Sequence, residues 1–171
     1  GTSAKKLEEK KVDIMHISPS HHFPTGMVMP ISKRYELLGW VTRKKERYII
    51  EDDYDSELRL AGKPIPSLQS IDVSGKVIYI NTFAKTLCST VRISYMVLPE
   101  ALAEKYYREL SFYSCTVSNF EQYTLAAFMN AGAFEKHINR LRNYYQHKRD
   151  LILSTFLREP LGKYITISEE D

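Results

Sequence analysis

The chain has 171 residues, 26% of them charged, and a formal net charge of +3, which suits one ordinary globular core. No apolar run approaches the roughly 20 residues of a membrane helix, so the sequence excludes a membrane-spanning protein. The charge is too small to predict nucleic-acid binding by this segment, and the two cysteines fit no metal spacing and are typical of reduced thiols in the cytoplasm.

The first half of the chain alternates strand and helix patterns. A helix is predicted at 31–44, directly behind Pro30. Short runs rich in β-branched and aromatic residues predict strands at 12–17, 48–50, 77–80 and 92–98. Because helices or long crossovers separate the strands, the sequence predicts an α/β layer structure with a largely parallel or mixed sheet.

The second half predicts helices. Pro99 opens one that runs to about Leu110, and Ser118 with Glu121 three positions on is a capping-box start for another. Apolar residues at helical spacing from 134 to 156 predict a long amphipathic helix.

Polar residues follow two of the predicted strands at the point where each ends. Glu51-Asp52-Asp53-Tyr54 ends the first, and Thr82-Phe83-Ala84-Lys85 ends the second. Ligands of open α/β sheets bind outside the carboxyl ends of the strands, so an acid, a phenol and a lysine are expected at one place. These are the parts that a pyridoxal phosphate site needs. Taken singly, each motif is better explained as a solvated loop or a surface lysine.

Four motifs in order, at residues 18–26 (SPSHHFPTG), 50–57 (IEDDYDSE), 62–66 (GKPIP) and 82–87 (TFAKTL), resemble one family. They are similar to the aminotransferase-like domain of the MocR/GabR group of GntR-type transcriptional regulators, and the resemblance continues to the region of Arg149 and Asp150. It implies part of a three-layer α/β large domain of pyridoxal-phosphate-dependent transferases of fold type I. A mixed, mostly parallel sheet and a long C-terminal helix belong to that expectation.

The resemblance also implies roles for single residues. Lys85 matches the lysine whose amine forms the internal aldimine with pyridoxal 5'-phosphate, a role that requires a desolvated amine. Asp52 matches the carboxylate that faces the pyridine nitrogen and keeps it protonated. Tyr54 matches the phenol that bonds the 3-hydroxyl oxygen of the ring. These three are the expected catalytic residues.

Three further residues complete the expected cofactor contacts. Thr82 and Arg92 resemble ligands of the cofactor phosphate, one through a hydroxyl and one through a charge-assisted fork. For Arg92, a surface ion pair remains an alternative. His22, with His21 beside it, is expected in a loop near the cofactor, because two adjacent histidines without a third ligand do not predict a metal site.

The sequence departs from the family pattern in places. Phe23 stands where ordinary aminotransferases of this fold type carry an asparagine that touches the 3-hydroxyl, and a phenyl ring can neither donate nor accept there. Relative to the regulators, Ala84 replaces a common serine, Ser89 a common proline and Ser94 a common glycine. These changes bear on the phosphate-binding part of the site and leave the lysine, acid and tyrosine intact.

The resemblance predicts that residues 1–158 form part of the cofactor-binding large domain and that residues 159–171 begin a small C-terminal domain. In the family, a winged-helix domain that binds DNA precedes the aminotransferase-like domain, and this chain carries none of it. An amino-acid-like effector or substrate, a homodimer and a cytoplasmic location are implied.

Three hypotheses for function follow. The first is an effector-sensing domain of a regulator, in which an amino compound forms an external aldimine on the cofactor. The second is a genuine pyridoxal-phosphate-dependent aminotransferase, so enzyme activity stays open; Phe23 in place of asparagine argues mildly against it. The third is a cofactor-free dimerisation scaffold, and the presence of Lys85, Asp52 and Tyr54 argues against that one.

Overall fold

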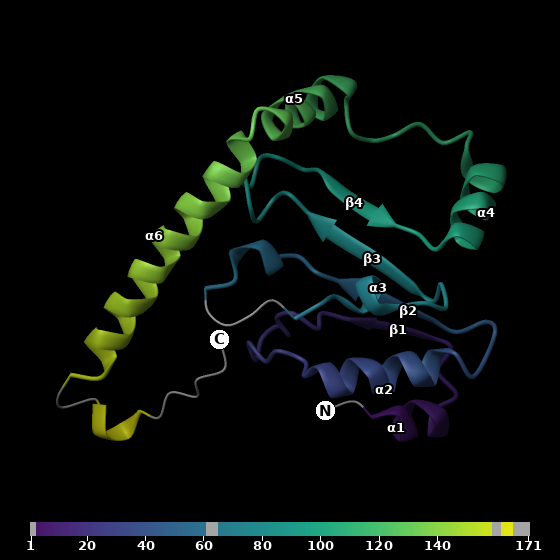
Figure 1. Cartoon of the computed structure of the whole chain (residues 1–171), viewed down its shortest axis with the longest axis horizontal. Coiled ribbons are helices and arrows are strands. Elements are labelled where there is room, and N and C mark those ends of the chain that lie inside the picture. The colour runs from purple at the N-terminus through teal and green to yellow at the C-terminus, as the bar shows by residue number, and fades with distance from the viewer. Residues whose placement is uncertain (1–2, 61–64, 159–161, 166–171) are drawn as a thin grey trace. The chain divides into compact units, whose positions relative to one another are not determined.

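A computed structural model of the chain describes residues 3–60, 65–158 and 162–165 (Figure 1). It divides into two compact units. The first comprises Gly1–Ser56 and Pro64–Thr116, and the second comprises Glu57–Lys63 and Val117–Asp171. The first three residues of the GKPIP motif lie outside the described residues. The domain boundary predicted between residues 158 and 159 falls where the description stops, because residue 159 is not described.

The first unit is built on a four-stranded sheet. Its strands are β1 (Ile14–Ile17), β2 (Tyr48–Asp52), β3 (Val77–Thr82) and β4 (Ser94–Val97), in the order β1-β2-β3-β4. The first three run parallel, and β4 is antiparallel to β3. The predicted mixed, mostly parallel sheet is thereby confirmed, and the carboxyl ends of β1, β2 and β3 meet at one edge.

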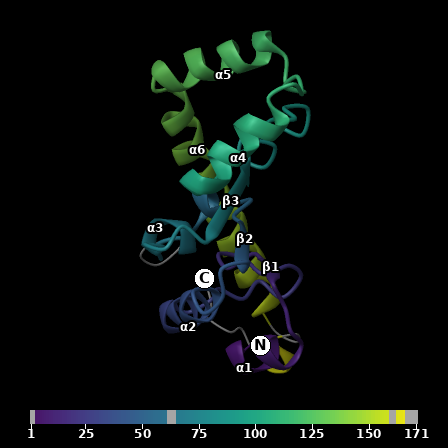
Figure 2. The same cartoon turned by 90° about the vertical axis from the view of Figure 1, so that its right-hand side faces the viewer.

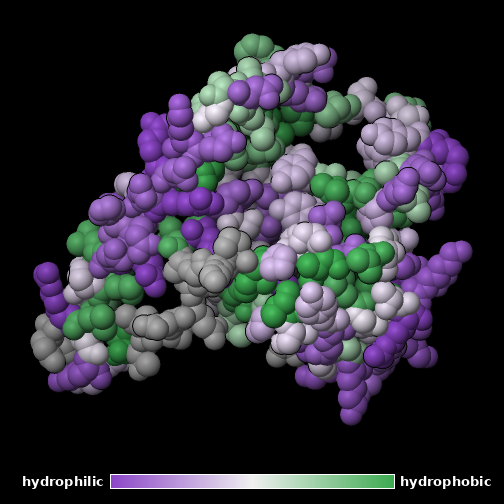
Figure 3. Space-filling model, in the orientation of Figure 1, coloured by the Kyte–Doolittle hydropathy of each residue, from purple (hydrophilic) through white to green (hydrophobic). Residues whose placement is uncertain are grey.

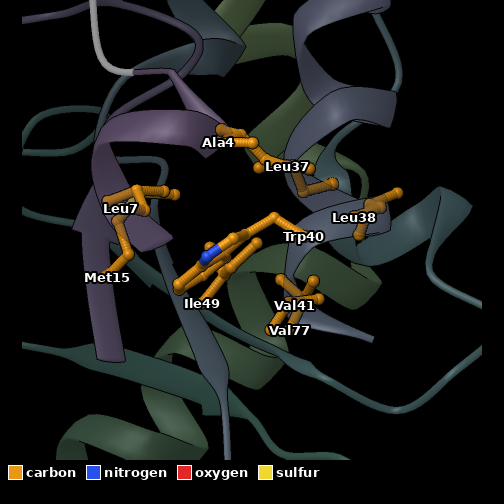
Figure 4. Packing of buried hydrophobic residues seen from close by; sticks show 10 residues of the cluster. Ala4, Leu7, Met15, Leu37, Leu38, Trp40, Val41, Ile49 and Val77 are labelled. Carbon is orange, nitrogen blue, oxygen red and sulfur yellow. The ribbon is translucent and has the colours of Figure 1, made fainter. Parts of the chain in front are cut away.

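One face of this sheet carries the hydrophobic core. Met15, Ile49 and Val77 point from the three parallel strands toward helices α1 (Ala4–Glu9), α2 (Ile31–Val41) and α3 (Leu68–Ile71). Figure 2 shows α2 and α3 on the same side of the strands. Trp40 lies fully buried beside Ile49 in the centre of the cluster (Figure 4). Burial of this many apolar side chains fixes the register, because a slip by one residue would turn them to the other face.

Strand β1 is shorter than the predicted range 12–17, because the Val12 amide is hydrogen-bonded to the end of the preceding helix. The sequence did not predict helix α1, and two residues after its end Lys11 lies in the left-handed region at φ 53°. The Val12 amide donates to the Leu7 carbonyl at 3.1 Å, and the Lys11 amide donates to the Glu8 carbonyl at 3.0 Å. This pair of bonds is a Schellman motif, so β1 begins only at Ile14.

Helix α2 begins behind Pro30 as predicted but ends at Val41 instead of residue 44. The Arg47 guanidinium donates to the Trp40 carbonyl at 3.1 Å and stacks over the Trp40 ring at 4.6 Å. It also forms two bonds of 2.7 and 2.6 Å to the Glu8 carboxylate. A buried cation therefore adds a second donor to a carbonyl near the end of the helix, which also accepts the Arg43 amide at 3.3 Å.

The predicted helices of the second half are present. Helix α4 (Glu100–Leu110) follows Pro99 in the first unit. In the second unit, α5 (Asn119–Asn130) starts at the Ser118 cap, whose hydroxyl accepts from the Glu121 amide at 3.2 Å. Gly132, at φ 66°, turns the chain into α6 (Ala133–Phe156). Two 3-10 turns, Ser56–Leu58 and Gly162–Tyr164, complete the described elements.

The second face of the sheet stays open. Its apolar side chains Ile14 and Met96 are 61% and 49% exposed. Figure 3 views the molecule from the other side, on which α2 and α3 lie, and shows apolar surface there as well. Asp52 and Thr82 project from this open face, because they alternate with the buried Glu51 and Asn81. Among the described helices, none is long and apolar enough to cross a bilayer.

Candidate functional site

The sheet topology brings all six expected site residues to one edge. Asp52 is the last residue of β2 and Tyr54 follows two positions later, while Thr82 ends β3 and Lys85 lies in the turn behind it. Thr82 pairs with Ser94 of the antiparallel β4, so Arg92 enters the sheet at the same edge. His22 lies in the loop that leaves β1.

The Asp52 carboxylate has a neighbour that the sequence analysis did not identify. His16 Nε2, on the adjacent strand β1, is 3.3 Å from Asp52 Oδ2, and the two side chains are 60% and 33% exposed. A polar residue between the apolar Met15 and Ile17 was the available signal, because it marks the open face of a strand. The imidazole orients the carboxylate and leaves its other oxygen available to a ligand.

Tyr54 ties two of the loops together. Its hydroxyl donates to the His21 carbonyl at 2.8 Å, and the His21 ring nitrogen Nδ1 lies 2.9 Å from Asp55 Oδ1. Burial, and then the charges of Asp55 and Asp52, raise the pKa of the Tyr54 phenol. The phenol therefore remains protonated at neutral pH, and its oxygen can still accept a hydrogen bond. We call residues 19–29 the histidine loop.

A second polar cluster lies on the opposite face of the strands. The Asp53 carboxylate accepts from the Tyr79 hydroxyl at 2.8 Å and from the Ser56 hydroxyl at 2.7 Å. The Asn81 amide donates to the Tyr79 oxygen at 3.1 Å. Asp53 is buried, so its two donors compensate part of its desolvation. This cluster braces β2 against β3 on the side away from Asp52.

We expect Tyr79 to make stability fall in alkali. Burial, and then the hydrogen bond to Asp53, raise the pKa of its phenol above the ordinary value of 10.0. The folded chain thus holds this proton more tightly than the unfolded chain, so the stabilisation is complete below the ordinary pKa and is lost as pH rises above it.

Chemical unfolding on either side of that pH tests this. Tyr79→Phe should lose about 1 kcal/mol at neutral pH and show a smaller further loss in alkali than the wild type. Tyr107→Phe, at an exposed tyrosine, is the control and should retain the wild-type pH dependence. Equal alkaline losses in both variants would contradict the assignment.

The turn after β3 holds Lys85 on the surface. The Thr82 hydroxyl donates to the Ile93 carbonyl and accepts from the Ala84 amide, both at 3.3 Å, and the Leu87 amide donates to the Phe83 carbonyl at 2.9 Å. These bonds form a tight turn in which Lys85 is exposed. The described residues therefore position the amine but do not supply the desolvation that its expected role requires.

The histidine loop borders a cavity of about 560 Å³. His16 and His22 line it together with Lys33 of α2 and apolar side chains of the loop. His22 Nδ1 lies 2.9 Å from the Thr25 hydroxyl oxygen, which fixes the ring plane. Phe23 is largely exposed, so the position where relatives carry a contacting asparagine adds no polar group here.

A buried ion pair lies directly behind the site. Arg34 of α2 and Glu51 of β2 have side chains that are 1% and 0% exposed, and Arg34 Nη1 is 3.8 Å from Glu51 Oε1. Burial raises the pKa of Glu51, although it accepts the Gln69 and Leu68 amides at 2.9 and 2.8 Å. The sequence marks Glu51 only as part of the polar signature, because a partner on another element leaves no local pattern.

The donor set fits pyridoxal 5'-phosphate. A half-open carboxylate on the open side of β2, a phenol oxygen with a free lone pair, a surface amine and an exposed guanidinium are gathered at one edge. Such groups can hold a pyridinium nitrogen, a ring hydroxyl, an aldehyde and a phosphate. Among the residues that the structure describes, no group of three or more His, Cys, Asp or Glu could hold a metal ion.

Several sequence relatives of the chain are transcriptional regulators of the HTH type. It is 43% identical over 171 residues to the uncharacterized regulator YdeL of Bacillus subtilis, a match that covers the whole chain and 36% of that protein. It is 37% identical over 158 residues to the probable rhizopine catabolism regulatory protein MocR of Rhizobium meliloti, covering 92% of the chain and 32% of that protein. The chain thus spans about a third of the length of these curated relatives. No protein-family model matches it.

Several solved structures similar to the chain are aminotransferases of fold type I. The kynurenine aminotransferase of Pyrococcus horikoshii, solved in complex with PMP, superposes with a TM-score of 0.77 at 30% identity. The match covers 90% of the chain and 38% of that protein. The expected fold class is thereby confirmed.

Proposed function

Because the chain is an aminotransferase-like segment of the MocR type, we propose that it is the pyridoxal-phosphate-binding, effector-sensing part of a transcriptional regulator. The observation that carries the proposal is the convergence of Asp52, Tyr54, Thr82 and Lys85 on the carboxyl edge of a parallel sheet. Regulators among the relatives and aminotransferases among the structural neighbours support the two halves of the proposal.

The proposal gives each residue one task. Lys85 binds the cofactor covalently as an internal aldimine and yields to an amino compound, which forms an external aldimine. Asp52, oriented by His16, keeps the pyridine nitrogen protonated, and Tyr54 bonds the ring hydroxyl. The remaining contacts are the phosphate ligands Thr82 and Arg92, and His22 beside the ring.

The partners follow from the same proposal. The effector is an amino-acid-like small molecule, and its capture shifts the equilibrium between two conformations of the regulator. DNA is bound by a domain outside this chain, in a homodimer located in the cytoplasm. Residues 1–158 are part of the cofactor domain, and residues 159–171 begin the next one.

Borohydride trapping tests the proposal. The full gene product is incubated with pyridoxal phosphate, reduced, digested and mapped by mass spectrometry. Phosphopyridoxyl label on Lys85 supports the site. Label spread over surface lysines, or absent, overturns it and favours the third hypothesis, a scaffold without cofactor.

A genuine aminotransferase is the second candidate, and the similarity to the kynurenine aminotransferase favours it. The discriminating experiment supplies an amino donor and a 2-oxo acid acceptor to the unreduced protein loaded with pyridoxal phosphate. Repeated turnover would make the protein an enzyme. A spectral response to the amino compound without turnover, together with altered DNA binding, would support a sensor.

A further inference from the structure

We propose that Arg34 is a positioning residue that fixes the histidine loop over the cofactor site, an inference that rests on the proposed function. The side chain leaves the first turn of α2 and is buried. It acts through the backbone of the loop that carries His21 and His22.

The guanidinium closes the base of the histidine loop. Nη2 donates to the Pro19 carbonyl at 3.1 Å and Nε donates to the Met29 carbonyl at 3.2 Å. The Met29 amide itself donates to the Pro19 carbonyl at 2.8 Å. Both ends of the loop are therefore held by one planar group, whose fork geometry can serve several oxygens at once.

The same group joins the loop to β2 and α3. Nη1 donates to the Pro66 carbonyl at 2.9 Å and lies 3.8 Å from the Glu51 carboxylate. Glu51 in turn accepts the Leu68 and Gln69 amides at the start of α3. Because Asp52 is the next residue after Glu51, the pair connects the loop to the strand end that carries the site.

The position of the loop matters to the site through Tyr54. The phenol that is expected to bond the cofactor ring donates to the His21 carbonyl, inside the histidine loop. His16 and His22 line the cavity beside the same loop. If the base of the loop opens, Tyr54 loses the acceptor that fixes its hydroxyl, and His22 moves with the backbone.

Hydrogen exchange and cofactor binding, measured separately on the full gene product, test the inference. The amides of His22, Gly26 and Met29 donate within the loop and report its opening. Arg34→Met should raise their exchange rates about tenfold or more, since it removes several hydrogen bonds from one local unit. It should weaken pyridoxal phosphate binding by a similar factor.

Arg47→Met is the matched control. Arg47 is equally buried and makes charged and carbonyl bonds, but it lies at the amino end of β2 with Glu8 and Trp40. It should lower the melting temperature and change neither loop exchange nor cofactor affinity. Equal loop exchange in the two variants would reduce Arg34 to a structural role and overturn the inference.

Arg34→Lys keeps the test decisive if the methionine variant does not fold. A lysine restores the charge opposite Glu51 but cannot reach three carbonyls in one plane. This variant should recover stability, but hydrogen exchange of the loop amides should stay fast. If lysine restores wild-type exchange rates at these amides, the inference is overturned. If the wild type does not bind pyridoxal phosphate, the proposed function fails, and the exchange comparison still decides whether Arg34 holds the loop.

Discussion

Replacing Lys85 by alanine should abolish the phosphopyridoxyl label at this position and leave the fold intact. The amine forms the covalent bond with the cofactor aldehyde, and alanine at this position carries no group that can form it. Lys85 is exposed in its turn, so we expect the free energy of unfolding to change by no more than about 0.5 kcal/mol. Mass mapping after borohydride reduction checks the loss of the label. A thermal melt checks that stability is unchanged.

Two further variants separate chemistry from charge. Lys85→Arg keeps the cation but cannot form a Schiff base under these conditions, so it should also lose the label. Lys33→Ala removes the lysine that lines the cavity beside His22, and it should retain full labelling at Lys85. A label that follows Lys33 would mean that the cavity lysine, and not Lys85, is the reactive amine.

In the complete regulator, Lys85→Ala should also remove the response of DNA binding to the amino compound. A variant that keeps a normal effector response without the lysine would exclude the sensing mechanism, even if the wild type carries the cofactor. Labelling and DNA binding therefore test different parts of the proposal.

The sequence predicts the edge of the sheet that bears the site because local patterns suffice there. Short β-branched runs define β2 and β3, and polar residues mark where each of them ends. The carboxyl ends of parallel strands lie at the same edge of a sheet, independently of the side chains they carry. The order of motifs then places Asp52 and Lys85 at the ends of two different strands before any distance is known.

The support behind the site is not predictable in the same way. Arg34 lies in an amphipathic helix and Glu51 in a polar signature, and each pattern alone indicates a solvated residue. Only the packing of α2 and α3 against β2 makes them a buried pair. The sequence does not identify His16 for a related reason. Whether its side chain lies beside Asp52 depends on which face of β1 stays open. Helix α1 lacks a distinctive sequence signal, and its Schellman end became visible only in the backbone.

Two adjacent aspartates should give opposite results when each is changed to asparagine. Asp52 projects from the open face, one-third exposed, with His16 as an exposed neighbour, whereas Asp53 is buried between Tyr79 and Ser56. Asp52→Asn should change stability by less than about 1 kcal/mol, because exposed ion pairs contribute little. It should weaken cofactor binding about tenfold or more, since a carboxylate that holds a pyridinium contributes well over 1.4 kcal/mol.

Asp53→Asn is the internal control for the face assignment. It should cost about 1 to 3 kcal/mol of unfolding free energy, because the Tyr79 and Ser56 hydroxyls lose a charged acceptor in a buried place. Cofactor affinity of the folded protein should stay within about a factor of three of the wild type, which corresponds to less than 1 kcal/mol. Titration with pyridoxal phosphate measures the cofactor affinity of both variants. A denaturant melt measures their free energy of unfolding. If Asp53→Asn loses the cofactor and Asp52→Asn loses stability, the open face of the sheet is not the cofactor face, and the assignment of Asp52 is wrong.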